Sequence, residues 1–275
     1  MSAALATPAP AVCDTPILAV EGITKRFGSA ADGVTAVDGV SFDIRPGEFV
    51  SVIGPSGCGK STLFNIIAGL QTATDGRVVV EGTPVRGPHP AVGTVFQEES
   101  CFPWRTVIDN VAFPLELAGI GRRERHEQAR HFIDLVGLRG FERRMPSELS
   151  GGMRQRVCIA RTLAAKPRLL LMDEPFAALD EQTRLLLGDK VLQIQQELNQ
   201  TTLLITHSIT EAVQLSDRVL VMTYRPGRLK RLMPIELPRP RTAAAVTSPE
   251  FGAAVASLWA DLREEASRGM REAGG

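Results

Sequence analysis

A run of nine residues, Gly54-Pro-Ser-Gly-Cys-Gly-Lys-Ser-Thr62, fits the phosphate-binding loop pattern G-x-x-x-x-G-K-[ST] at every fixed position. Gly57 and Gly59 let the backbone wrap around an anion and turn its N–H groups inward at the start of a helix. Lys60 can then reach the β- and γ-phosphates, and the Ser61 hydroxyl can ligate Mg²⁺. The sequence therefore predicts a nucleoside triphosphate site made by Gly54, Pro55, Ser56, Gly57, Cys58, Gly59, Lys60, Ser61 and Thr62.

Two carboxylates, Asp173 and Glu174, follow directly after the apolar run 169–172. In an open α/β sheet, ligands bind at the carboxyl ends of the strands. Asp173 is suited to hold Mg²⁺ opposite Ser61. Glu174 points to the other face of the strand, where it could polarise an attacking water. Alone, such a pair often does no more than end a strand, but its place between the phosphate loop and Thr206-His207 favours catalysis.

A third motif, Leu149-Ser150-Gly151-Gly152, precedes a helical run from Val157 to Ala165. Small residues at a helix N-terminus form a second potential phosphate site. Ser is also a favoured N-cap residue, so an ordinary helix cap explains the same motif. The motif by itself leaves both explanations open.

The elements that must position these residues follow from the periodicity of the chain. Short alternating segments over 17–53, broken by Gly and Pro, predict antiparallel strands, and the charge-rich stretch 107–165 has helical spacing. Strands then return at 168–172, 202–206 and 218–222. A helical stretch lies between the first two of these, and strand–helix–strand alternation predicts a buried, mostly parallel sheet flanked by helices. The predicted fold class is α/β.

Composition limits the classes of function. The 275 residues carry 31 basic and 31 acidic side chains, so no global basic field indicates nucleic acid or an anionic membrane surface. No apolar run approaches the roughly 20 residues of a membrane-spanning helix. Met1–Pro10 lacks the pattern of a secretory signal and is expected to be a flexible tail. Cys13, Cys58, Cys101 and Cys158 show no metal-ligand spacing, which favours free thiols in a reducing cytoplasm.

In this order, the three motifs resemble those of the ATP-binding cassette (ABC) family of ATPases, over about residues 17–235. One position departs from the family pattern Leu-Ser-Gly-Gly-Gln, because Met153 stands in place of the final glutamine. The serine and the glycines make the phosphate contact in that family, so we expect the change to be tolerated.

The resemblance implies roles at further matching positions. Gln97 would contact Mg²⁺ and the nucleophilic water, and His207 would contact the γ-phosphate. Asp180 would signal between subunits, and Phe27 would stack on adenine where the family usually has tyrosine. The predicted catalytic residues are Lys60, Gln97, Glu174 and His207, and the predicted Mg²⁺ ligands are Ser61, Gln97 and Asp173.

The resemblance also implies a domain organisation, namely a P-loop NTPase core with an N-terminal antiparallel β subdomain and an inserted helical subdomain. The expected divisions are a flexible tail over 1–16, an ABC ATPase domain over 17–237 and a C-terminal tail over 238–275. Within the domain, 17–96 and 166–237 form the nucleotide-binding core and 97–165 the helical subdomain.

Cassettes of this family resemble half-sites, because the phosphate loop of one copy faces the Leu-Ser-Gly-Gly loop of another. This chain carries one loop of each kind, which predicts a partner ATPase subunit, most simply a second copy in C₂ arrangement. Leu149, Ser150, Gly151 and Gly152 would then act in trans on ATP and Mg²⁺ held by the partner.

Two classes of function compete. The first is a transporter subunit at the cytoplasmic face of the cell membrane, docked on a separate integral membrane permease and served by a periplasmic or lipid-anchored solute-binding protein. The second is a soluble mechanical ATPase acting on nucleic acid or ribosomes. The segment between Lys60 and Ser150 has no sustained heptads, and the chain carries one cassette and no basic field. These features favour transport, with no nucleic-acid partner.

Several strings resemble the nitrate/sulfonate/taurine type of importer ATPase, above all Pro103-Trp104-Arg105 and Arg225-Pro-Gly-Arg228. The polyamine/sugar type carries a C-terminal regulatory domain, for which too few residues follow Leu237. The transported solute is not encoded, because it never touches the ATPase.

Two segments keep alternatives open. Phe102 and Trp104, in the loop after Gln97, are predicted to grip a permease helix, since an exposed large aromatic often marks an interface; alternatively, Trp104 fills the small core of the helical region. In the C-terminal tail, an apolar stripe predicts an amphipathic helix that packs either on its own cassette or on a partner. Its members are Phe251, Val255, Leu258 and Leu262.

Overall fold

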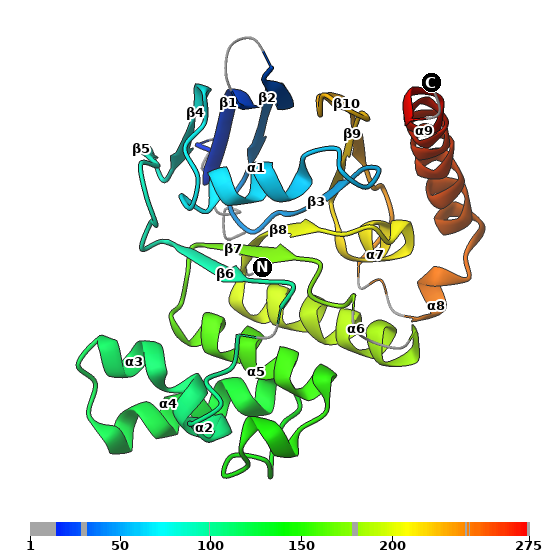
Figure 1. Ribbon diagram of the computed structural model, residues 1–275. Coiled ribbons are helices and arrows are strands. Elements are labelled where there is room, and N and C mark those ends of the chain that lie inside the picture. The colour runs from blue at the N-terminus through cyan, green and yellow to red at the C-terminus, as the bar shows by residue number, and fades with distance from the viewer. Residues whose placement is uncertain are drawn as a thin grey trace, which may run out of the picture.

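The computed structural model describes residues 15–28, 32–98, 100–177, 181–239, 241 and 243–273. Two sheets stand one above the other in Figure 1. The smaller sheet is antiparallel, with strand order β2-β1-β4-β5. Its strands are β1 (Leu18–Phe27), β2 (Val34–Ile44), β4 (Asp75–Val80) and β5 (Thr83–Pro84).

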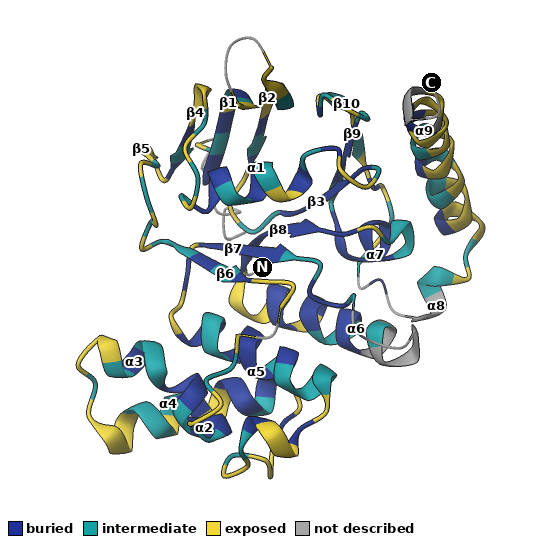
Figure 2. Ribbon diagram, in the orientation of Figure 1, coloured by how far each residue is buried: buried dark blue, intermediate teal, exposed yellow. Residues whose placement is uncertain are grey.

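The larger sheet has the order β10-β9-β3-β8-β7-β6, in which β10 alone of these strands pairs antiparallel. Its strands are β3 (Phe49–Ile53), β6 (Val92–Val95), β7 (Leu169–Asp173), β8 (Thr201–Ile205), β9 (Arg218–Met222) and β10 (Leu229–Pro234). The central strands β3, β7 and β8 are buried on both faces, as near-continuous apolar runs require (Figure 2).

Helix α1 (Lys60–Ile67) lies between the two sheets and fills the space with Leu63, Phe64 and Ile67. On the other face of the larger sheet, α6 (Glu181–Leu198) and α5 (Gly151–Ala164) contribute to a second core. The helices α2 (Val107–Val111), α3 (Phe113–Leu117) and α4 (Arg122–Leu135) pack with α5, and a short 3₁₀ turn (Pro146–Glu148) precedes it. The remaining helices are α7 (Ile209–Leu215), α8 (Ala243–Val246) and α9 (Pro249–Ala273).

The predicted α/β fold is confirmed, with its antiparallel N-terminal sheet and its helical insertion between β6 and β7. The sequence did not predict β5 or β10, and the C-terminal helix continues beyond the last residue of the predicted apolar stripe, Leu262, to Ala273. Asp180 and Cys13 lie outside the described residues. Within the described part of the chain, no helix combines the length and the apolar character needed to span a bilayer.

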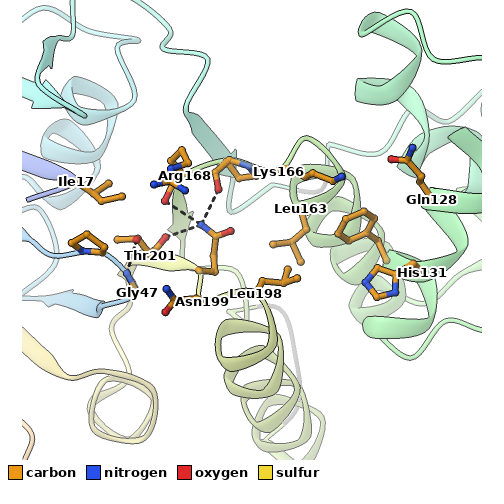
Figure 3. A pocket seen from close by; sticks show the side chains of 14 residues that line it. Ile17, Gly47, Gln128, His131, Leu163, Lys166, Arg168, Leu198, Asn199 and Thr201 are labelled. Carbon is orange, nitrogen blue, oxygen red and sulfur yellow. Dashed lines mark hydrogen bonds between the residues drawn. The ribbon is translucent and has the colours of Figure 1, made fainter. Parts of the chain in front are cut away.

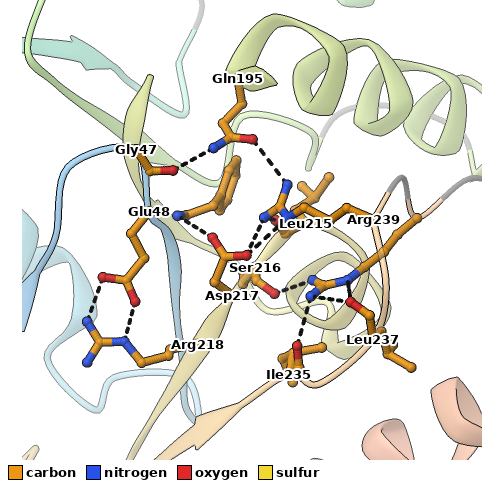
Figure 4. Close-up of polar contacts among 12 residues, drawn as sticks. Gly47, Glu48, Gln195, Leu215, Ser216, Asp217, Arg218, Ile235, Leu237 and Arg239 are labelled. Atoms are coloured by element: carbon orange, nitrogen blue, oxygen red, sulfur yellow. Dashed lines mark hydrogen bonds and ion pairs between the residues drawn. The ribbon is translucent and has the colours of Figure 1, made fainter. Parts of the chain in front are cut away.

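The C-terminal stripe packs on the chain's own core, because Phe251 and Leu258 are buried in one cluster with residues of α7 and β9. Figure 4 shows the polar contacts that attach the preceding segment. Arg239 donates to Asp217, and the buried Arg241 donates to the backbone carbonyls of Ser216, Ile235 and Leu237. Burial lowers the pKa of Arg241 to about 10, and the carbonyl acceptors offset part of the cost of burying its charge.

Candidate functional site

The predicted site residues meet because their strands end at the same edge of the larger sheet. In register, Val52 of β3 lies opposite Ile205 of β8, and Ile205 lies opposite Asp173 of β7. The segments that follow these strands therefore emerge side by side. They are the phosphate loop, Thr206-His207 and Glu174. This is the edge at which open α/β sheets bind ligands.

The phosphate loop has the backbone that its glycines predict. Gly59 precedes α1 with φ of 99°, and a Cβ there would lie 2.6 Å from the carbonyl oxygen of Ala36. Lys60 begins the helix, and its side chain is only 8% exposed. Its Nζ donates to the carbonyl oxygens of Gly54 at 2.8 Å and Pro55 at 3.1 Å. The loop therefore holds a buried ammonium beside backbone N–H groups at a helix N-terminus, which is a phosphate-binding arrangement.

A cavity of about 460 Å³ opens over this loop. Its lining comes from the phosphate loop, both long strands of the antiparallel sheet, and two segments at the edge of the larger sheet. The residues are Phe27, Val34, Ala36, Ser56, Gly57, Gly59, Lys60, Ser61, Thr62, Glu174 and Arg225. Phe27, at the end of β1, is 43% exposed, so its ring is free to stack on a flat ligand next to the loop.

The two carboxylates differ in their surroundings. Burial, reinforced by the charge of Glu174 and opposed by Lys60, raises the pKa of Asp173 to about 6. Glu174 is held with φ of 44°, its N–H donating to the Ile205 carbonyl oxygen at 2.8 Å. Its Oε2 lies 3.1 Å from Nδ1 of His207. A non-glycine residue in this left-handed region costs roughly 1–3 kcal/mol, a strain often found at functional sites.

The oxygen ligands at this site suit a Mg²⁺ ion that is bound partly by a substrate phosphate better than a metal ion bound by protein side chains alone. Among the described residues, no group of three or more His, Cys, Asp or Glu side chains could hold a metal ion. Mg²⁺ is commonly bound through one or two protein groups plus substrate phosphates and waters. Lys60 offsets only part of the burial and of the Glu174 charge that raise the pKa of Asp173, so a further cation beside Asp173 and the Ser61 hydroxyl would be stabilised there.

Two predicted sites lie apart from this cavity lining. Gln97 follows β6 two residues beyond Val95, whose register partner is Met172, so it belongs to the same sheet edge but does not line the cavity. Ser150 caps α5, its hydroxyl accepting from the Met153 N–H at 3.3 Å. Figure 1 shows α5 across the larger sheet from α1, so the Leu-Ser-Gly-Gly loop does not reach the phosphate loop of its own chain.

One cavity residue, Arg225, had no predicted role. Its Nε donates to the Gly57 carbonyl oxygen at 2.9 Å, and its guanidinium lines the cavity. The turn that carries it sits tightly on the phosphate loop, since a Cβ at Gly227 would lie 2.0 Å from the Cys58 carbonyl oxygen. The string Arg225-Pro-Gly-Arg228 signals the turn, but its contact with residue 57 depends on the tertiary fold.

A second cavity, of about 540 Å³, lies away from these groups, at the amino ends of the strands (Figure 3). Gln128 and His131 of α4 face Ile17 and Gly47 across it. The side-chain amide of Gln200 donates to backbone carbonyls, and Arg168 pairs with Glu81. These polar groups already have hydrogen-bond or ion-pair partners. This cavity is therefore a weaker candidate for binding or catalysis than the phosphate-loop cavity, although its volume is larger.

The family model described as "ABC transporter" matches residues 37–177 of this chain. The chain belongs to the ABC transporter family. An ABC transporter ATP-binding protein of Methanocaldococcus jannaschii is 50% identical over 92% of this chain and 94% of its own length. In the solved structures, a dimeric ATP-binding cassette in a post-hydrolysis state with ADP and Pi superposes with a TM-score of 0.71 at 30% identity, covering 80% of this chain and 99% of that one.

Two relatives of this ABC chain have names that specify a solute. The nitrate transport protein NasD of Klebsiella oxytoca is 46% identical, over 82% of this chain and 88% of its own length. The bicarbonate transport ATP-binding protein CmpC of Synechococcus elongatus is also 46% identical, over 82% of this chain but 34% of its own length.

Arg225 generates a first prediction. Replacing Arg225 by Gln removes a charge next to the phosphate loop, so the Kd for ATP should rise about tenfold, as expected for one charge-assisted hydrogen bond of roughly 1.5 kcal/mol. Calorimetric titration with ATP measures this. Arg228→Gln is the matched control, because Arg228 lies in the same turn but pairs with Asp38. An unchanged affinity in Arg225→Gln, or an equal loss in both variants, would contradict the assignment.

Proposed function

We propose that this chain is the ATP-hydrolysing subunit of an importer, acting as a pair of copies at the cytoplasmic face of a membrane and driving a separate permease. The observation that carries the proposal is the convergence of Lys60, Asp173 and the Glu174–His207 pair at one sheet edge, below a cavity of nucleotide size. The division into a core (17–96 and 166–237), a helical subdomain (97–165) and terminal tails belongs to the same proposal.

The chemistry proposed is hydrolysis of the terminal phosphoanhydride. Lys60 and the loop N–H groups bind the β- and γ-phosphates. Ser61 and Asp173, with Gln97, would hold Mg²⁺, which would neutralise charge that develops on the phosphoryl group. Glu174 orients the attacking water, and its carboxylate accepts hydrogen bonds from that water and from His207. The His207 side chain is 57% exposed, so its ring is free to turn from Glu174 towards a γ-phosphate.

A second copy completes the site in this proposal. Ser150 does not line the cavity over the phosphate loop of its own chain, and it caps a helix whose first N–H groups can bind an anion. The related cassette of solved structure is a dimer. Leu149, Ser150, Gly151 and Gly152 of one copy then contact the ATP held by the other, and Asp180 is proposed to signal between the two.

The surface for the permease is proposed to be an aromatic cluster formed by Phe102, Trp104 and Phe113. Trp104 is 72% exposed, which rules out the alternative that it fills the core of the helical region. It stacks on Phe102 with ring centroids 5.6 Å apart, and Phe102 meets Phe113 edge-on at 4.8 Å. Leu117, four residues after Phe113 on α3, is 73% exposed, so two large apolar side chains, Trp104 and Leu117, are exposed on these segments.

The substrate class proposed for the whole transporter is a small oxyanion or organic acid of the nitrate type, delivered by a solute-binding protein. Relatives named for nitrate and for bicarbonate are equally similar, which supports the anion class without selecting a member. A mechanical ATPase on nucleic acid is disfavoured by the balance of 31 basic and 31 acidic residues.

Glu174 provides the test of hydrolysis. In Glu174→Gln the turnover of ATP should fall at least about a hundredfold, because the group that orients the water is lost. ATP affinity should stay unchanged, since Lys60 still binds the phosphates. Phosphate release and equilibrium ATP binding measure the two effects. Glu197→Gln, an exposed carboxylate on α6, is the control. Normal turnover in Glu174→Gln would overturn the assignment.

The trans arrangement predicts a covalent link between copies. One copy carries Ser56→Cys and the other Gly151→Cys, both with Glu174→Gln to retain ATP and with the native cysteines replaced by serine. Mixing the copies with ATP and a mild oxidant should give a disulfide-linked dimer on a non-reducing gel, and either copy alone should not. A chain that carries both Ser56→Cys and Gly151→Cys would refute the composite site if its disulfide formed within that one chain.

If the aromatic cluster binds the permease, changing it should impair assembly with the permease and leave ATP hydrolysis intact. Trp104→Ala should keep ATP turnover of the isolated subunit within about twofold, while the fraction that sediments with host membranes falls about tenfold, as expected for a central aromatic contact. Trp259→Ala is the control, because Trp259 is 59% exposed on α9, away from the cluster. Equal membrane association of Trp104→Ala and the unaltered chain would exclude this docking surface.

A further inference from the structure

Two cysteines far apart in the sequence meet beside the nucleotide edge. Sγ of Cys101 lies 3.4 Å from Sγ of Cys158, although 57 positions separate them. Cys101 lies in the connection between β6 and α2, four residues after Gln97, and is half-buried. Cys158 lies on α5, the helix that Ser150 caps, and is 2% exposed. Cys101 is therefore the more exposed residue of the pair, and Cys158 contacts its sulfur from inside the core.

The surroundings favour a thiolate in this pair. Arg161 donates to the carbonyl oxygen of Ser100 at 2.8 Å and to its Oγ at 2.7 Å, which holds a positive charge next to the sulfurs. The hydrogen bond from Cys101, with help from Arg161 and Ser100, outweighs burial and lowers the pKa of Cys158 to about 6. The lowered pKa favours the thiolate, which is the reactive form of a cysteine.

We propose that Cys101 and Cys158 form a reversible thiol-oxidation site, at which a peroxide produces a disulfide that ties the β6–α2 connection to α5 and slows ATP turnover. The effect on turnover rests on the proposed function, whereas formation of the disulfide does not. An S–S bond of about 2.05 Å requires the two sulfurs, now 3.4 Å apart, to approach by roughly 1.4 Å.

The chemistry balances with hydrogen peroxide as the oxidant. The Cys101 proton passes along the S–H···S contact to Cys158, and the Cys101 thiolate attacks one peroxide oxygen, which breaks the O–O bond and leaves sulfenic acid and hydroxide. Cys158 then attacks the Cys101 sulfur and expels a second hydroxide, and its own proton and one from solvent convert the two hydroxides to water. In sum, two thiols and one peroxide yield one disulfide and two waters. A dithiol reductant reverses the change.

The disulfide would act on turnover because α5 and the β6–α2 connection are the elements on which Gln97 and Ser150 sit. Their present contacts are non-covalent, from the Arg161 hydrogen bonds to Ser100 at 2.7 and 2.8 Å to the Gln155 amide donating to the Phe96 carbonyl oxygen at 3.3 Å, so they can break and re-form. A covalent bond so close to Gln97 fixes the connection to the helix. Displacement of a catalytic group by about 1 Å can cost up to a hundredfold in rate.

Peptide mapping tests the modification itself. The full-length chain is treated with stoichiometric hydrogen peroxide, alkylated without reduction and digested with trypsin, which releases Cys101 in peptide 87–105 and Cys158 in peptide 157–161. Each peptide contains a single cysteine, so one linked species identifies the bond. The linked species should dominate, should disappear with dithiothreitol, and should be absent in Cys101→Ser and Cys158→Ala. The proposal would be overturned if Cys101 and Cys158 were recovered as free thiols to the same extent as Cys13. It would also be overturned if each of the two carried a sulfinic acid and no link formed.

Turnover tests the consequence. Oxidation should lower ATP hydrolysis by the unaltered chain about tenfold or more, and dithiothreitol should restore it. Cys101→Ser should hydrolyse ATP normally before peroxide and show no such loss after it, which separates this site from oxidation of Cys58 in the phosphate loop. A quantitative disulfide with unchanged turnover would refute the regulatory effect. A reduced chain that hydrolyses no ATP would instead refute the proposed function, and the peptide map would still decide whether the disulfide forms.

Discussion

The buried ammonium of Lys60 is the interaction on which the rest of the site depends. A charge that is 8% exposed is costly unless it is paired, and here two carbonyl oxygens of its own loop accept its hydrogen bonds. The same charge opposes the burial and the Glu174 repulsion that raise the pKa of Asp173. The site therefore holds a cation and a carboxylate pair whose charges are only partly compensated. A triphosphate with a divalent cation would supply the missing charges of both signs.

Close packing around the loop extends this constraint to distant segments. Gly59 has no room for a side chain against β2, and Gly227 has none against Cys58, so strand β2 and the Arg225–Arg228 turn fix the loop from two sides. The turn can approach because β9, which precedes it, pairs with β3, which precedes the phosphate loop. The neighbouring strands β3 and β9 therefore position the phosphate loop and the arginine that contacts it.

Local patterns predicted most of this structure, and contacts distant in sequence account for the rest. The phosphate loop, the Asp173–Glu174 pair and the Ser150 helix start are each encoded by consecutive residues, so their elements could be predicted. Arg225 could not be assigned, because its contact with residue 57 bridges 168 positions. The thiol contact at Cys101 and the exposure of Trp104 likewise depend on how the β6–α2 connection lies on α5. Element ends also shifted, and the short edge strand β5 has too few residues to give a pattern.

The β6–α2 connection joins the nucleotide edge to the exposed Trp104. It leaves the sheet at Phe96, next to the strand that ends in Asp173. At its far end, the wholly buried Asn110 accepts from the Phe102 N–H and donates to the carbonyl oxygens of Phe102, Arg105 and Thr106. That side chain makes the stretch 102–106 a rigid piece attached to α2. A shift that reaches Phe102 is therefore not absorbed within 102–106 but moves Trp104 together with α2.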